Sequence, residues 1–455
     1  MGREVAAPRS LPGPDTAGAD EFRGLKLMEI ELCQPLPGLS YDGKYRRVWI
    51  LARLLTEPIG ACIVDVDADG LSPARLGSIL WPDLQQAITS RFTAAHVPAP
   101  PELTGDGLDV AAESWPFLQA RAAALNTPPF ISVIVCTYNR PALLEVCLAH
   151  LEKQQYPSFE VIVVDNGPRA GVVRAHVASL DAARYRYLHE PRAGLSRARN
   201  AGVAVASGDI VAFIDDDEEP DACWLAALAR GFDRGSDVAC VTGLILPACL
   251  DTEAQFLFEE VGGHSKGRGF ESAIFSAHGP QSPLFPQPPF GAGGNMAFRR
   301  AALSKIGRFD QALGAGTPAL GAEDTLALTL VLLSGFAIAY EPAAFVRHHH
   351  YRDFAGAAGQ LRGYAVGMGA FYVALLRRRP WLVRDLVLLT PEAVRYLRGS
   401  RSRADQLPVP HRTELVFRRG RQMLAGPPAY LLGVLRNTWF SALQTAVGRK
   451  PLSRR

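Results

Sequence analysis

Three consecutive aspartates, Asp215, Asp216 and Asp217, directly follow an apolar, strand-like run at 210–214. In an extended chain Asp215 and Asp217 lie on one side and Asp216 on the other. Adjacent carboxylates repel, and a strand end offers them no lysine or arginine partner nearby, so a bound cation is the expected compensation. Two hard oxygen ligands on one side suit Mg2+ or Mn2+ that carries substrate phosphates. A solvated acidic loop is the plainer interpretation.

The segments around the aspartates predict the sheet that positions them. Runs at 130–137 and 159–165 are apolar throughout, and a helix opened by Pro141 separates them, as in a parallel sheet covered on both faces. Thr137, Asp165 and Asp215 then end three strands of one sheet, at the edge where open α/β sheets bind ligands. No Gly-x-Gly-x-x-Gly follows the first strand, which disfavours a dinucleotide-binding oxidoreductase.

Whole-chain properties exclude some classes of protein. The 455 residues allow two or three domains, and a net charge of +3 is too small to indicate nucleic acid as a partner. Seven cysteines show neither metal-ligand spacing nor a disulfide framework, which is typical of a reducing, cytoplasmic compartment. The apolar stretch at 325–346 is interrupted by Ser334-Gly335 and by Pro342, so we expect a buried helix and strand there and no membrane span.

Seven segments, in order, resemble the family 2 glycosyltransferases with the A-type fold. They are SVIVCTYNR, VIVVDNGP, GLSRARNAG, FIDDD, GAGGNMAFRR, GAEDTLALTLVLLSG and YEPAAFVRHHHYRD. The resemblance implies an α/β fold with a mostly parallel, Rossmann-like sheet. It also implies an enzyme that uses Mn2+ or Mg2+ to move a sugar, with inversion, from a nucleotide sugar to a hydroxyl acceptor in glycan, cell-envelope or glycolipid biosynthesis.

The same resemblance implies which residues bind the donor. It places the nucleotide against Thr137, Tyr138, Arg140, Asp165, Asn166, Arg199, Asp215 and Asp216, and the metal against Asp215, Asp217, His348 and His350. Many relatives carry an acid or a small polar residue where this chain has Asn166, so UDP-, dTDP- and GDP-sugars all stay open as donors. Arg199 and the histidine run at 348–350 also fit ordinary surface groups.

Two further segments are candidates for contact with the sugar and the acceptor. Glu323 and Asp324 open a helix after Gly321, and the resemblance makes Asp324, ahead of Glu323, the base that deprotonates the acceptor hydroxyl. An acidic helix start is the plain alternative, because the helix dipole favours carboxylates there. The glycine run before Asn295 lets backbone at Gly294 approach a sugar that the amide could bind, or it forms a structural turn.

The organisation along the chain is predicted in four parts. They are a disordered N-terminus at 1–24, a small α+β domain at 25–126, the glycosyltransferase domain at 127–353 and a helical, basic C-terminal extension at 354–455. In the small domain we expect strands within 28–36, 45–55 and 61–70, a turn at 57–60 and a helix at 71–92. Glycines at 363, 367 and 369 allow close helix contact in the extension.

Partners and competing functions follow from these parts. The acceptor can be a saccharide, a lipid-linked molecule or a small molecule, and the arginines at 377–379 beside Trp381 could touch the inner face of an anionic membrane, or form a solvated helix end. A sugar nucleotidyltransferase would show an early glycine-rich, basic phosphate loop, which this chain lacks. A non-catalytic, sugar-binding or scaffolding descendant would be expected to lose acids that are costly to keep together.

Overall fold

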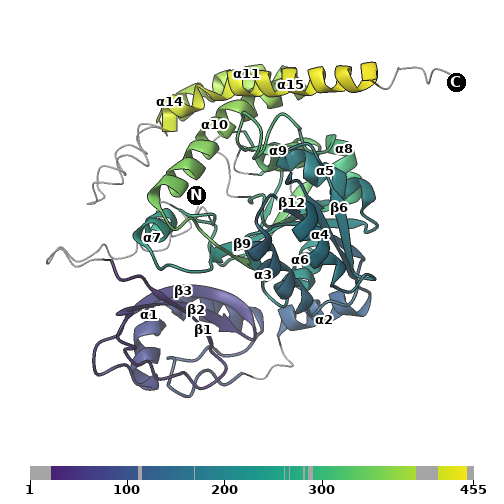
Figure 1. Ribbon diagram of the computed structural model, residues 1–455. Coiled ribbons are helices and arrows are strands. Elements are labelled where there is room, and N and C mark those ends of the chain that lie inside the picture. The colour runs from purple at the N-terminus through teal and green to yellow at the C-terminus, as the bar shows by residue number, and fades with distance from the viewer. Residues whose placement is uncertain are drawn as a thin grey trace.

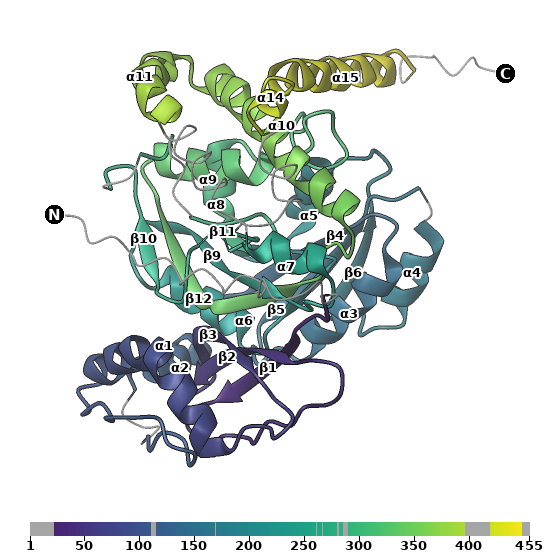
Figure 2. The ribbon, with the colours of Figure 1, turned by 90° about the vertical axis from the view of Figure 1, so that its left-hand side faces the viewer.

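The computed structural model describes residues 22–110, 115–168, 170–260, 262–265, 267–279, 282–284, 290–395 and 419–447. Its strands form a large sheet of nine and a small sheet of three. The large sheet occupies the middle of the molecule, the small sheet lies at one end and the C-terminal helices lie at the other (Figures 1 and 2). Most of the predicted N-terminal segment at 1–24 falls outside the described residues, and the four predicted boundaries stay predictions.

One half of the large sheet is parallel, as the sequence predicted. Its strands, in spatial order, are β7 (Ile210–Asp215), β4 (Ile131–Thr137), β5 (Phe159–Asp165) and β6 (Tyr185–His189). The helices that connect them are α3 (Pro141–Glu152), α4 (Ala170–Ala178) and α5 (Leu195–Val205). Val133 and Val135 pack in the same core as α3, whereas Ile134 packs in the same core as α5. Both faces of β4 are therefore buried, which explains its continuous apolar sequence.

The other half of the sheet mixes strand directions. Its strands are β8 (Glu218–Pro220), β9 (Val238–Pro247), β10 (Ala273–Phe275), β11 (Met296–Arg299) and β12 (Ala337–His348). β11 lies between β7 and β9 and runs antiparallel to both, while β12 runs parallel to β9. The helices of this half are α6 (Trp224–Phe232), α7 (Glu253–Glu260), α8 (Arg300–Ile306) and α9 (Glu323–Leu333). The stretch at 325–346 is thus the buried helix and strand that we expected.

The small sheet contains β1 (Lys26–Glu31), β2 (Arg47–Leu54) and β3 (Glu57–Asp65), and is followed by α1 (Pro73–Ala94) and α2 (Pro116–Asn126). The predicted turn at 57–60 is wrong, because these residues belong to β3. The chain reverses at Leu55 and Thr56, which adopt φ values of 51° and 73°. The Glu31 carboxylate accepts the backbone N–H groups of both residues, at 2.8 and 2.7 Å, and so stabilises a conformation that neither side chain favours.

A buried charged junction joins the small sheet to the large one. Arg230 on α6 pairs with Glu57 of β3 and, at 2.9 Å, with Glu341 of β12. Arg91 on α1 also reaches Glu57, at 2.8 Å. Glu57 and Glu341 are 3% and 5% exposed, so their charges depend on these guanidinium groups.

The C-terminal helices pack over the α9 side of the large sheet (Figure 2). They are α10 (Phe354–Arg378), the 3-10 helix η2 (Pro380–Leu382), α11 (Val383–Leu388), α14 (Arg419–Met423) and α15 (Gly426–Val447). A Cβ atom on Gly369 would lie 1.9 Å from the Met423 carbonyl oxygen, and one on Gly367 would lie 3.0 Å from Gly321. Gly369 therefore makes the predicted close contact with another helix, and Gly367 makes a close contact with the loop before α9. No helix in the described residues is long and apolar enough to cross a membrane.

Candidate active site

Three predicted site residues lie side by side at the carboxyl ends of the parallel strands. Thr137 on β4 is paired in register with Asp165 on β5, and its neighbour Cys136 is paired with Asp215 on β7. The Asp215 side chain keeps 35% of its surface exposed, whereas Asp216 and Asp217 keep 6% and 14%. Of the three aspartates, Asp215 is therefore the most open to a ligand.

The turn after β7 brings the histidine run to the aspartates. After Asp215 the chain reverses through Asp216 and Asp217 into β8, which pairs antiparallel with the end of β12, so that Glu218 faces His348. The His348 Nε2 atom lies 3.6 Å from Asp217 Oδ1. A carboxylate and an imidazole that are distant in sequence are thus presented together by strand pairing.

The expectation that no basic residue partners the aspartates is wrong. Arg140 places Nη1 2.6 Å from Asp217 Oδ2 and 3.3 Å from Asp216 Oδ1. Arg199 places one nitrogen 3.1 Å from Asp215 Oδ1 and the other 2.7 Å from Glu323 Oε1. Arg199 is 1% exposed, so the alternative of a surface charge is also wrong for this residue. Arg140 lies between β4 and α3, and Arg199 lies on α5, so neither is next to the aspartates in the sequence. The sequence around the aspartates alone could not reveal these partners.

Acid groups nevertheless outnumber the bases that reach them. In the described residues, five carboxyl groups with raised pKa values share the two guanidinium groups of Arg140 and Arg199; they belong to Asp215, Asp216, Asp217, Glu218 and Glu323. Burial is the largest cause in each case. For Asp216, burial and the neighbouring Asp217 raise the pKa to about 7. The surplus of buried acid is the electrostatic environment in which an added cation is stabilising.

Glu323 and Asp324 open α9 beside this cluster. Ala322 precedes them in the left-handed region at φ 70°, and no side chain caps the helix. The Oδ1 atom of Asp324 accepts the backbone N–H of Thr325 at 2.6 Å, and Arg199 holds Glu323. A non-glycine residue in this region costs of order 1 kcal/mol or more, so the surrounding structure forces the helix to begin here. Asp324 is half-buried, whereas Glu323 is 5% exposed.

The glycine loop before β11 packs against the chain's own acids. A Cβ atom on Gly293 would lie 3.1 Å from both Arg199 Nη2 and Asp324 Cβ, and one on Gly294 would lie 2.2 Å from Glu218 Oε1. The Asn295 amide is 0% exposed; it accepts from Trp224 Nε1 and donates to the carbonyls of Leu244 and Ala344. The prediction that Asn295 binds sugar hydroxyls is therefore wrong, since its amide is buried and occupied.

The predicted nucleotide-binding residues comprise buried side chains that are occupied by other protein groups and exposed side chains. Asn166 donates to the carbonyls of Glu190 and Arg192 and accepts from the N–H of Gly194, so its amide closes a loop and has no donor left for a base. Asp165 accepts from Gly167 N–H and from the Tyr187 hydroxyl, and Thr137 donates to Asp216 at 2.7 Å.

Tyr138, by contrast, is 51% exposed, and Arg140 keeps 39% of its side chain exposed. These two residues are therefore the most accessible members of the predicted nucleotide edge.

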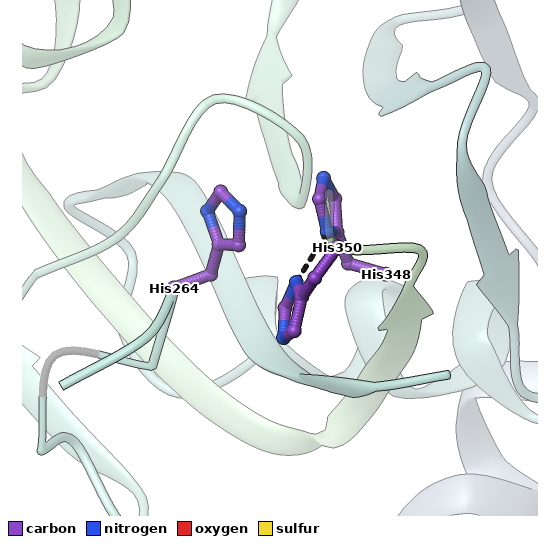
Figure 3. Close-up of side chains that lie close together, drawn as sticks. All are labelled: His264, His348 and His350. Carbon is purple, nitrogen blue, oxygen red and sulfur yellow. Dashed lines mark hydrogen bonds between the residues drawn. The ribbon is translucent and has the colours of Figure 1, made fainter. Parts of the chain in front are cut away.

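Three imidazoles gather close together (Figure 3), and one of them, His348, lies 3.6 Å from Asp217. His348 and His350 were predicted, but His264, in the turn after α7, was not. One nitrogen of each ring lies within 4.8 Å of a nitrogen of the other two. His350 Nε2 contacts Glu259 Oε1 on α7 at 2.7 Å, and the middle residue of the run, His349, turns away to Glu219 at 2.7 Å. Neither Glu259 nor His264 lies in a segment with a recognisable pattern, so neither could be found from sequence.

Comparison with known proteins agrees with the motifs. The model of the family described as glycosyl transferase family 2 matches residues 132–307. The succinoglycan biosynthesis protein ExoM of Rhizobium meliloti is 30% identical over 229 residues, which cover 49% of this chain and 67% of ExoM. The chain belongs to glycosyltransferase family 2. This membership agrees with the α/β fold of the A-type that the sequence predicted.

Other relatives of this family 2 glycosyltransferase match over shorter lengths. Glycosyltransferase AglE of Haloferax volcanii is 34% identical over 126 residues, which cover 27% of this chain and 39% of AglE. The chain thus spans well under half of the length of that relative. A solved structure, the mannosyltransferase PcManGT of Pyrobaculum calidifontis in complex with GDP-Man and Mn2+, is 19% identical with a TM-score of 0.39. The match covers 71% of this chain and 94% of that one.

The Glu323 carboxyl should make the stability of this glycosyltransferase depend on pH. Burial and Asp324 outweigh Arg199 and raise the pKa of Glu323 from 4.5 to about 7. The folded state therefore binds a proton more tightly than the unfolded chain, and this contribution to stability is present below pH 4.5 and lost as the pH rises to 7. With a chelator present, this effect should lower the free energy of unfolding of the wild type by on the order of 3 kcal/mol between pH 4.5 and 7. Glu323→Gln should abolish this decrease.

Urea unfolding at half-unit steps from pH 4.5 to 8 measures this difference. The exposed Glu102 provides a control, since Glu102→Gln should follow the wild-type curve. A Glu323→Gln curve parallel to that of the wild type would show that Glu323 does not carry the raised pKa.

Proposed function

We propose that this protein transfers a sugar from a nucleotide-sugar donor to a hydroxyl acceptor, with a divalent cation and with inversion at the anomeric carbon. The observation that carries the proposal is the surplus of largely buried carboxyl groups at the carboxyl end of β7 and at the starts of β8 and α9, beside an imidazole. A leaving nucleoside diphosphate develops negative charge, so a cation that balances the acids also suits the reaction. Family membership supports the same chemistry.

Asp217 and His348 form the best-fitting cation site. Their facing atoms, Asp217 Oδ1 and His348 Nε2, are 3.6 Å apart, and both side chains are largely buried. Asp215, which is more exposed, would complete the site or contact the ribose. Carboxylate oxygens with one imidazole suit Mn2+, and Mg2+ less well, since imidazole favours transition metals. The chemistry that a bound cation would supply is Lewis-acid stabilisation of the leaving diphosphate.

The chain's own residues would orient the donor and take up the acceptor proton. Arg140 and the exposed Tyr138 would flank the nucleotide, while Arg199 keeps Glu323 and Asp215 at fixed positions. Asp324, half-buried beside Gly293, would accept the proton from the acceptor hydroxyl as its oxygen attacks. A base on the side of the sugar opposite the diphosphate gives a single displacement, so the product carries the opposite anomeric configuration.

The donor nucleotide in this proposal is UDP, dTDP or GDP. The Asn166 amide is occupied by backbone groups, so it does not distinguish among these nucleotides. ExoM is named as a succinoglycan biosynthesis protein, which supports a role in glycan synthesis. A sugar nucleotidyltransferase and a non-catalytic binding protein are the competing functions. They differ in a measurable way: only a glycosyltransferase hydrolyses or transfers from nucleotide sugars and releases a nucleoside diphosphate.

Donor binding should require the cation and Asp217. In a thermal-shift panel of UDP-, dTDP- and GDP-sugars, the matching donor with Mn2+ should stabilise the protein by about 2.7 kcal/mol at 100 times its dissociation constant. Asp217→Asn should abolish most of this shift, because it removes a charged ligand.

Asp209 directly precedes β7, at the opposite end of this strand from Asp217, and 95% of its side chain is exposed. Asp209→Asn should therefore behave as wild type. Full donor binding in excess chelator, or in Asp217→Asn, would refute the cation site. Release of pyrophosphate from a nucleoside triphosphate and a sugar 1-phosphate, with no nucleoside diphosphate released from any nucleotide sugar, would favour the nucleotidyltransferase.

Asp324→Asn should separate a catalytic role from a structural one. The amide oxygen can still accept from Thr325, so the free energy of unfolding should stay within about 1 kcal/mol of wild type. It cannot take the proton, so turnover should fall by about 10²- to 10⁴-fold while donor binding persists.

The matched control is Asp353→Asn, at the N-cap of α10, where Asp353 accepts the N–H of Gly356; this variant should keep its turnover. Proton NMR of the wild-type product should show the inverted linkage. Retention of configuration would refute a single displacement, and near-normal turnover in Asp324→Asn would leave Asp324 with a structural role.

We also infer that the C-terminal helices rest on an anionic membrane surface. Large apolar side chains are exposed there; they are Trp381, Val383, Val387 and Leu388 around α11, and Leu424, Leu431, Leu435 and Trp439 at α14 and α15. These three helices lie on the side of the molecule away from the small sheet (Figures 1 and 2). Arg384, Arg395 and Arg436 are exposed in the same segments of the chain, as expected for contact with acidic headgroups. Such contact supports a lipid-linked acceptor.

Vesicle co-sedimentation tests this contact. Wild-type protein should pellet with vesicles that contain phosphatidylglycerol and much less with pure phosphatidylcholine. Trp381→Ser combined with Val387→Ser should reduce the pelleted fraction, because two exposed apolar groups are lost. Val172→Ser on α4, which is 64% exposed on another face, is the control and should pellet normally. Equal pelleting of all three proteins would refute the proposed face.

A further inference from the structure

A chain of polar contacts runs from α7 to the proposed cation site. Glu259 Oε1 lies 2.7 Å from His350 Nε2, and His350 Nδ1 lies 2.8 Å from His348 Nδ1. The remaining nitrogen of His348, Nε2, faces Asp217 Oδ1 at 3.6 Å. Both imidazoles are almost fully buried, at 4% and 5% exposure. The contact between the two rings is the dashed line in Figure 3.

With one proton on each ring, the partners at the two ends decide which nitrogen carries it. A carboxylate only accepts hydrogen bonds, so His350 must carry its proton on Nε2 to donate to Glu259. Its Nδ1 atom is then an acceptor, and His348 must donate from its own Nδ1. The lone pair of His348 is left on Nε2, directed at a carboxylate oxygen. Two acceptors that face each other across 3.6 Å are stabilised by a cation between them.

We propose that Glu259 and His350 are positioning residues, which fix the tautomer and direction of His348 so that its Nε2 is a cation ligand. The proposal rests on the cation site of the proposed function. It differs from the sequence prediction in one assignment, because His350 becomes a partner of the ligand and is no longer a ligand itself. Metal-bound imidazoles commonly donate a hydrogen bond from their second ring nitrogen to a partner outside the metal site.

Helix α7 holds His350 by both its backbone and its ring. Gln255 donates to the His350 carbonyl at 3.2 Å, and Glu259, four residues later and so on the same helix face, accepts from the ring. The Phe258 ring packs against the His350 imidazole with centroids 4.9 Å apart. A residue held at its backbone carbonyl, at one ring nitrogen and at its ring face has one orientation, as a positioning role requires.

His264 completes the wall of this site and is not part of the relay. Its ring lies against that of His348, with centroids 4.2 Å apart, while its two nitrogens lie 3.3 Å from Gln360 Nε2 and the Tyr364 hydroxyl on α10. In the alternative arrangement all three imidazoles bind one ion. Loss of His264 would then weaken cation binding as much as loss of His348.

Mn2+ affinity of the full-length protein, measured from the electron paramagnetic resonance of free Mn2+, tests the relay. His348→Ala should lose binding. Glu259→Gln and His350→Phe should weaken binding by about 10- to 100-fold, as is usual for outer partners of a ligand. His350→Asn should recover most of that loss, because its amide oxygen can accept from His348 at the position of Nδ1. His264→Ala should retain more affinity than His348→Ala.

A matched control is present in the same run. His349 pairs with Glu219 at the same distance as His350 with Glu259, but its ring is directed to Glu219, while only its backbone N–H bonds Asp217, at the carbonyl oxygen. His349→Ala and Glu219→Gln should therefore change Mn2+ affinity much less than Glu259→Gln does, since the charge of His349 acts on Asp217 only through space. A loss in these variants equal to that of Glu259→Gln would overturn the relay, because it would reflect general disturbance of β8 and β12.

Nitrogen-15 NMR of histidine-labelled protein without metal reads the tautomers directly. We expect a proton on Nδ1 of His348 and on Nε2 of His350. A proton on His348 Nε2 would overturn the proposal, as would a His350→Asn variant as damaging as His348→Ala, which would make His350 a direct ligand. If wild-type protein does not bind Mn2+ at all, the cation of the proposed function fails; if it binds but Glu259→Gln has wild-type affinity, only the relay fails.

Discussion

Charge balance at the carboxyl end of β7 is the constraint on which the site depends. Buried carboxyl groups outnumber the two guanidinium groups that reach them, and burial raises their pKa values. The chain accommodates this by sharing: Arg199 serves Asp215 and Glu323, and Arg140 serves Asp216 and Asp217. Glycines at 293 and 294 leave the room that these side chains need. The conformation of this glycine loop is therefore explained by its packing against the protein's own charged side chains.

The sequence predicted the strands that carry the site because their signals are local. Apolar runs at 131–137 and 159–165 need both faces covered, and the acids that follow them must share one edge. The predicted grouping of Asp217 with His348 also holds, although through a register between β8 and β12 that no local pattern specifies. The roles of Asn166 and Asn295 could not be predicted, since an amide that closes a loop and one that binds a ligand look alike in sequence.

Long-range partners explain the remaining differences. The sequence leaves Arg199 open between a nucleotide contact and a helix surface charge, whereas the structure buries it against β7 and α9. The turn of the small sheet was misplaced by two residues because the Glu31 carboxylate, more than 20 positions away, stabilises positive φ at Leu55 and Thr56. Glu259 belongs to a helix with no motif, and it matters only through the residue that it touches.

The junction at Arg230 constrains how such a chain can be rearranged. Glu57 from the small sheet and Glu341 from the large sheet share one buried guanidinium group. Removing the small sheet would take Glu57 away, expose Arg230 and Glu341 to water and leave Arg230 with half of its compensation. An unrelated module in its place would need a new acid at the same position. The N-terminal unit is therefore coupled electrostatically to the strand that ends in His348. Recombination between relatives would have to transfer β3 and β12 as a matched set.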